Sequence, residues 1–247
     1  MIGAYTLIFF GVVVWAVVQP IGKTLSPRLM RAVTVFGGAY LLAVCFINLV
    51  PHLFLHGFTS PSLGIKYAAA IPLGFLIQMF LEQLSSHVEH GHFDGHSHAG
   101  HNHEGYTIWG LILGLSLHAF IEGMPLVEPD GDIHRGLLYG IVLHNIPMSL
   151  IFVSLMTARG YGFWRVAALL SIFAVMTPLG SVCNLTLLPA DEELQTFIIG
   201  IVVGILLHVS SSILFDHHDN RFSWSKALLI VIAFTAAYFT PGCAEIY

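Results

Sequence analysis

The sequence has few charged residues for its length. Only 9% of the 247 residues are Asp, Glu, Lys or Arg, while 56% are hydrophobic. Soluble domains carry about 25% charged residues, so this chain lacks the side chains that would cover a water-exposed surface. The composition excludes an ordinary soluble fold and indicates a polytopic protein of the lipid bilayer.

Cysteines and basic clusters are also scarce. Cys45, Cys183 and Cys243 lie far apart and form no CxxC pair, which argues against a disulfide framework or a thiolate metal site. A net charge of −5 gives no basic surface, so we expect no nucleic-acid partner. The first segment lacks a basic leader and an A-x-A site, so we expect residues 2–18 to be a retained span.

Long apolar segments fill the rest of the chain. Runs of about 20 apolar residues without period-two alternation favour helices over a membrane barrel. We predict an all-α fold with eight transmembrane helices in one transport domain, residues 1–247. The predicted spans are residues 2–19, 32–56, 64–86, 106–127, 133–157, 163–188, 194–215 and 224–243.

Basic residues predict the orientation of these spans. Seven of the nine Lys and Arg residues lie in, or within a few residues of, the loops after spans one, three, five and seven. Because cytoplasmic loops are enriched in Lys and Arg, that side is predicted to be cytoplasmic. Both termini are then outside, and the host is expected to be the cell (inner) membrane.

The predicted cytoplasmic loop at residues 87–105 is rich in histidine. Small polar residues separate the histidines, so the loop has no means of forming a core. Imidazoles bind borderline divalent metals, which predicts metal binding by the loop, with a solvated linker as the alternative. The histidines are His87, His90, His92, His96, His98, His101 and His103.

Spans four and five carry polar groups at mid-length. His118 and Glu122 are four residues apart and share a helix face, and a turn near Asp130 places His144 at a similar depth. No Lys or Arg lies mid-span to pair with Glu122. Two imidazoles and one carboxylate suit Zn²⁺, and also Fe²⁺, Mn²⁺, Co²⁺ or Cd²⁺. The alternative is a protonated Glu122 that hydrogen-bonds a histidine.

Residues beside these groups offer further donors. Asn145 is a candidate amide ligand, and Met148 is a candidate soft ligand or a packing residue. Pro125 and Pro147 each free a carbonyl four residues earlier, which predicts broken helices next to the site.

Polar groups elsewhere suggest a pathway through the membrane. Asn48 and His52 lie late in span two, while His208 lies in span seven, shortly before Asp216. We expect these residues to line the metal pathway. Hydrogen bonds between helices are the alternative for His208.

Together these motifs resemble the ZIP (Zrt/Irt-like) family of metal transporters. The resemblance lies in the eight spans, the His-rich loop, HxxxEG at 118–123, HNIP at 144–147 and FINLVPHL at 46–53. It implies a carrier that imports divalent metal, usually zinc, with outward termini and no enzyme activity. It also implies a 3+2+3 arrangement of inverted repeats, a homodimer, and elevator-like movement of the metal-bearing helices.

The family's metal ligands map onto His118, Glu122, His144 and Asn145. Many members have a carboxylate where Met148 stands, and some have Glu where Thr177 stands. The resemblance with these departures implies one metal rather than two.

Two other functional classes fit the same donors. An intramembrane zinc hydrolase also needs three ligands and a water, but only Ser116 and Asn145 lie nearby as helpers. A metal-efflux carrier or a sensor is the other class, because ligand chemistry does not specify the direction of transport.

Overall fold

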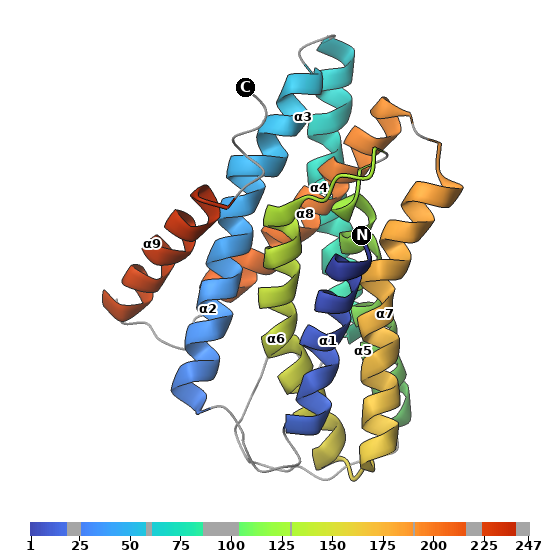
Figure 1. Cartoon of the computed structure of the whole chain (residues 1–247), viewed down its shortest axis with the longest axis vertical. Helices are drawn as coiled ribbons and strands as arrows, with labels where there is room; N and C mark the ends of the chain where they lie inside the picture. The colour runs from blue at the N-terminus through green and yellow to red at the C-terminus, as the bar shows by residue number, and fades with distance from the viewer. Residues whose placement is uncertain are drawn as a thin grey trace.

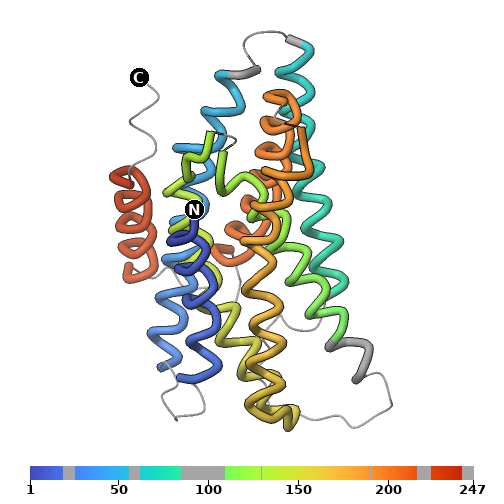
Figure 2. The backbone as a smooth tube through the Cα atoms, turned by 45° about the vertical axis from the view of Figure 1, so that its right-hand side comes forward, coloured from blue at the N-terminus to red at the C-terminus, as the bar shows by residue number. Residues whose placement is uncertain are grey.

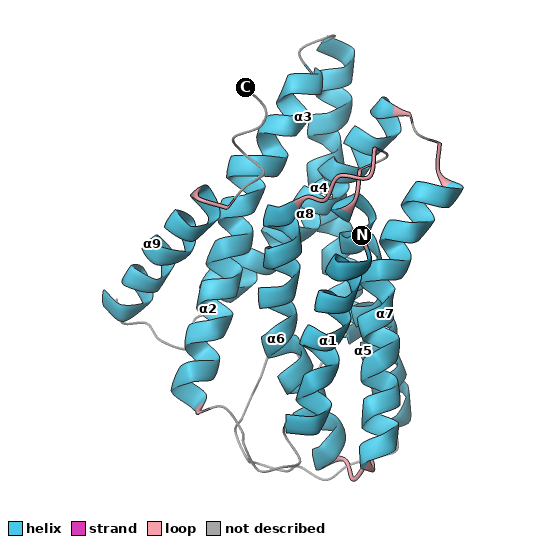
Figure 3. Ribbon diagram, in the orientation of Figure 1, coloured by secondary structure: helices cyan, strands magenta, loops and turns pink. Residues whose placement is uncertain are grey.

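The computed structural model describes residues 1–18, 26–57, 61–85, 104–128, 130–189, 191–215 and 224–240. Within these ranges the backbone is helical apart from short turns, and no strand is present (Figure 3). The one isolated β-bridge in this part of the chain joins Val127 to Ile133. The all-α prediction is confirmed.

The described residues form eight helical rods, as predicted. Successive rods run in opposite directions along a bundle (Figures 1 and 2). One rod is continuous through three elements, α2, η1 and α3. The elements are α1 (Ile2–Val18), α2 (Pro27–Val44), η1 (Cys45–Leu49), α3 (Val50–Gly57), α4 (Pro61–Ser85), α5 (Glu104–Gly123), η2 (Met124–Leu126), α6 (Arg135–Ala158), α7 (Phe163–Leu187), α8 (Glu192–Phe215) and α9 (Trp224–Tyr238).

Six of the rods are long and apolar enough to cross a membrane. Helices α1 and α9 have only 17 and 15 residues, shorter than the spans of 18 and 20 residues predicted there. A full crossing needs about 20 residues. The predicted end of span eight, at 243, lies outside the described residues.

A π-helical turn, η1, interrupts the second rod. Pro51 has no N–H, so the carbonyl of Ile47 loses its α-helical donor. Just before it, the N–H of Val50 donates to the carbonyl of Cys45, five residues back. Such turns accommodate one extra residue in a helix and are frequent at functional sites.

The buried apolar residues form two cores. One core joins α1, α5, α6 and α7. The other joins α2, η1, α3, α4, α8 and α9 with one end of α1 and of α6 and with η2. The metal-ligand candidates on α5 and α6 therefore lie on helices whose main packing partners include α1 and α7. The first core consists of Val12, Ala16, Leu111, Leu115, Ala119, Phe152, Val153, Met156, Val166, Leu170, Phe173 and Ala174.

Glycines let two helix pairs approach backbone to backbone. A Cβ on Gly74 of α4 would meet the carbonyl of Ile201 of α8, while a Cβ on Gly180 of α7 would meet that of Phe120 of α5. On α5, a Cβ on Gly123 would meet the carbonyl of Thr177. Small residues at such crossings are typical of membrane helix packing. The α5–α7 contact lies next to Glu122 and fixes that part of α5.

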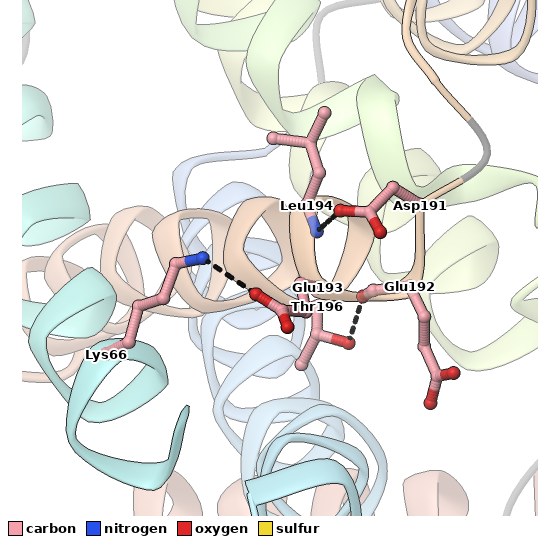
Figure 4. Close-up of polar contacts among 6 residues, drawn as sticks. All are labelled: Lys66, Asp191, Glu192, Glu193, Leu194 and Thr196. Atoms are coloured by element: carbon pink, nitrogen blue, oxygen red, sulfur yellow. Dashed lines mark hydrogen bonds and ion pairs between the residues drawn. The ribbon is translucent and has the colours of Figure 1, made fainter. Parts of the chain in front are cut away.

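The N-terminus of α8 shows how the few charged residues are used (Figure 4). The Asp191 carboxylate accepts a hydrogen bond from the N–H of Leu194 at 3.1 Å and caps the helix. Lys66 of α4 pairs with Glu193 at 3.2 Å, with both side chains about half exposed. Exposed pairs of this kind contribute about 0–1 kcal/mol, so the pair adds little to the α4–α8 contact.

Candidate metal site

A tight turn brings together the two helices that carry the candidate metal ligands. Gly131 has φ +95°, and the Asp130 carboxylate accepts a hydrogen bond from the N–H of Asp132 at 3.1 Å. The turn lies where the sequence predicted it and makes α5 and α6 antiparallel. The rings of His118 and His144 consequently face each other, with centroids 5.8 Å apart and planes at 76°.

His118, Glu122 and His144, hereafter the core cluster, are almost completely buried. Their exposed fractions are 4%, 0% and 2%. His118 Nε2 lies 3.6 Å from a carboxylate oxygen of Glu122, which is too long for a hydrogen bond. His118 Nε2, His144 Nδ1 and both Glu122 oxygens have no hydrogen-bond partner.

Gln78 of α4 contacts the candidate site, and sequence reasoning missed it. It is 3% exposed, and its Oε1 lies 2.9 Å from Nδ1 of His118. With the proton on Nδ1, His118 presents the lone pair of Nε2 toward Glu122. Hydrogen bonds of this kind orient metal-binding histidines. The available signal was an amide at mid-span, but sequence spacing gave no partner for it.

The core cluster has donors of the right kind for a metal cation. Two ligands at about 2.0–2.1 Å from a tetrahedral zinc lie roughly 3.3 Å apart, close to the His118–Glu122 distance. Among the described residues, no three His, Cys, Asp or Glu side chains already surround a common point. Metal binding there would require His144 to turn toward the other two donors.

Comparison with known proteins identifies the family of this chain. Residues 94–238, more than half of the chain, match the family described as ZIP zinc transporter. The chain belongs to the ZIP zinc transporter family. A comparison with curated proteins finds no match. Because ZIP proteins are divalent-metal transporters and not enzymes, the hydrolase alternative is set aside.

The other predicted donors of this ZIP protein have different surroundings. Asn145 is 2% exposed, and its Oδ1 has no hydrogen-bond partner. Met148 is half-buried and packs against the core of α1, α5, α6 and α7, which agrees with a packing role.

The prediction of two broken helices beside the site was wrong. Pro125 lies in the 3₁₀ turn η2 after α5 has ended, so it interrupts no helix at mid-span. Helix α6 continues through Pro147, and the freed carbonyl of Leu143 faces Gly37 of α2.

On one side of the core cluster, polar groups continue between α4 and α8. His208 lies 3.4 Å from the Glu82 carboxylate, and its ring lies 4.6 Å from that of Phe75. Gln78 and Glu82 are four residues apart on α4 and so follow one helix face. Asp216 and the His-rich loop lie outside the described residues.

At the opposite end, the predicted pathway residues meet the α5–α6 turn. The amide of Asn48 lies against Gly136 of α6, where a Cβ would meet Nδ2. The ring of His52 lies 6.3 Å from that of His134. His134 Nε2 in turn lies 2.9 Å from a Glu128 oxygen. Glu128 and His134 were missed because a turn gives no helical spacing to count.

Proposed function

We propose that this ZIP transporter carries Zn²⁺ into the cytoplasm through a mid-membrane site made of His118, Glu122, His144 and Asn145. Fe²⁺, Mn²⁺, Co²⁺ and Cd²⁺ are the competing cargoes, because the same N and O donors accept them. The observation that carries the proposal is the set of buried donor atoms without partners on all four residues.

The energetics favour a cation at these atoms. A buried polar atom without a partner costs about 1–3 kcal/mol, and a buried charge without a partner costs more. Glu122 is fully buried, and neither oxygen has a partner. A dication would satisfy the carboxylate, both imidazoles and the Asn145 oxygen together. A neutral Glu122 bonded to His118 fits less well, because the 3.6 Å separation exceeds a hydrogen bond.

The proposed route uses the polar groups on either side. Asn48 and His52 would receive the metal from outside, and Gln78, Glu82 and His208 would lead it inward. Asp216 and the His-rich loop at 87–105 would accept it on the cytoplasmic side. The direction rests on the excess of Lys and Arg in the loops at that end.

The two apolar cores suggest which helices move. Helices α5 and α6 share a core with α1 and α7, so we propose that these four shift together against the remainder. The helix contacts support the inverted-repeat arrangement, in which α1 corresponds to α7 and α2 corresponds to α8. The contact of α1 with α6 is matched by that of α7 with α5, and the contact of α2 with α9 is matched by that of α8 with α4. Copies would pair as the homodimer that the family resemblance implies.

Uptake of radioactive zinc into reconstituted vesicles tests the site. Glu122→Gln should abolish uptake, since it removes the negative charge that holds the cation. Glu193→Gln removes an equally charged but half-exposed carboxylate and should transport like the wild type. Uptake by Glu122→Gln at the wild-type rate would show that the site is misassigned.

A further inference from the structure

A second group of His and Glu side chains lies at the end of the bundle that holds the α5–α6 turn. This turn cluster consists of His52 from α3 with Glu128 and His134 from the turn. It offers two imidazoles and one carboxylate, the same donor types as the core cluster. Neither Glu128 nor His134 has a part in the mid-membrane site.

The backbone of the turn holds the two new donors in place. The N–H of Glu128 donates to the carbonyl of Asp132 at 2.9 Å, and that of His134 donates to the carbonyl of Leu126 at 3.1 Å. These bonds form a short antiparallel ladder around the Val127–Ile133 bridge. Glu128 and His134 therefore project from a fixed backbone, which lowers the entropy lost on binding a ligand.

The distances suit adjacent ligands of one cation. His134 Nε2 and the Glu128 oxygen are 2.9 Å apart, against roughly 3.3 Å for neighbouring ligands of a tetrahedral zinc. The ring of His52 lies 6.3 Å from that of His134 and nearly perpendicular to it, at 88°. This separation is similar to the 5.8 Å between the rings of the core cluster. A small rotation of His52 would bring a third donor to the pair.

Exposure separates the two clusters. The side chains of His134 and Glu128 are 19% and 39% exposed, whereas those of His118 and Glu122 are 5% and 0% exposed. A hydrated cation could reach the turn cluster from water and keep some of its water ligands. Binding there needs no movement of helices.

We propose that His52, Glu128 and His134 form a second divalent-metal site that captures Zn²⁺ at the mouth of the pathway. The capturing role rests on the proposed transport function, whereas binding itself does not. Two of the donors are joined by the turn to the helices that carry the core cluster, and His52 belongs to the flanking rod. A bound metal therefore links the two helix groups at this end.

Carbethoxylation of histidines, read by peptide mass spectrometry on the full chain, tests the binding site by site. Zn²⁺ should protect His134 and His52 from diethyl pyrocarbonate. Glu128→Gln should raise the zinc concentration needed for protection of His134 on the order of tenfold. Asp132→Asn removes one exposed carboxylate from the same turn and should leave protection unchanged.

Glu122→Gln separates this proposal from the proposed function. That variant should keep zinc protection of His134 while losing uptake. If His134 reacts equally with and without zinc, at concentrations that protect the His-rich loop, the turn site is overturned. If protection occurs but the wild type moves no zinc, the turn site stands and the transport assignment fails.

Discussion

The core cluster and the turn cluster each have two imidazoles and one carboxylate, but they differ in their surroundings. In the core cluster, His118 and Glu122 are buried 3.6 Å apart. Three of their atoms and one atom of His144 have no hydrogen-bond partner. In the turn cluster, His134 and Glu128 are partly exposed and pair with each other at 2.9 Å. Burial keeps the first set of donors unsatisfied, whereas partial exposure gives the second set access to water, even though His134 Nε2 is itself a buried atom without a hydrogen-bond partner.

This difference predicts different roles for similar residues. A cation in the core cluster replaces interactions that the protein lacks, so each donor there should matter greatly. A cation in the turn cluster must displace an existing ion pair and water, so each donor there should contribute less. We expect the first cluster to control whether transport occurs and the second to control the zinc concentration at which it occurs.

The largest expected effect comes from comparing one histidine substitution in each cluster. His144→Ala should lower uptake by about 100-fold or more, because even outer-shell partners are worth about 10- to 100-fold in metal affinity. His134→Ala should raise the KM for zinc by about tenfold and leave the maximal rate near that of the wild type. Vesicle uptake over a range of zinc concentrations measures both. An equal loss of maximal rate in the two variants would show that the two clusters do not have different roles in transport.

A glycine substitution should affect one cluster and spare the other. In Gly180→Ala the new Cβ would meet the Phe120 carbonyl, which forces α7 away from α5 beside Glu122. Overpacking of this kind costs about 1–3 kcal/mol. Uptake and thermal stability should fall, while zinc protection of His134 stays intact. Gly162→Ala, with open space around its Cβ, is the matched control, and the same loss in that variant would argue against the α5–α7 contact.

The smallest expected effect concerns the orientation of His118. Gln78→Leu removes the acceptor for the Nδ1 proton and should weaken zinc affinity about tenfold, seen as a raised KM. Gln83→Leu changes an exposed amide on the same helix and should have no effect. Gln78→Glu keeps an acceptor and should recover most of the affinity. No recovery in Gln78→Glu would point to packing rather than orientation of the ring.

The sequence was sufficient for the parts that depend on local periodicity. The lengths of the apolar runs predicted eight helices. The number of residues from Asp130 to each histidine predicted that His118 and His144 face each other. Both follow from fixed helix geometry. The expectation for Pro125 failed because the helix ends before it, and helix ends depend on capping and tertiary contacts that spacing does not reveal.

The remaining site residues depend on contacts between distant segments. Gln78 meets His118 across 40 residues of sequence, and the pairing requires α4 to lie against α5. His52 meets His134 only because the start of α3 lies beside the α5–α6 turn. No periodic pattern within one span encodes such neighbours, so their identity came from the fold.

The π-helical turn Cys45–Leu49 sets the direction of His52. Each residue of an α-helix advances the rotation by about 100°, so one additional residue rotates everything after it by that angle. With a regular α-helix in its place, the imidazole at position 52 would point about a quarter-turn away from His134. The direction in which the His52 side chain points is thus fixed by the π-helical turn that precedes it in the same rod.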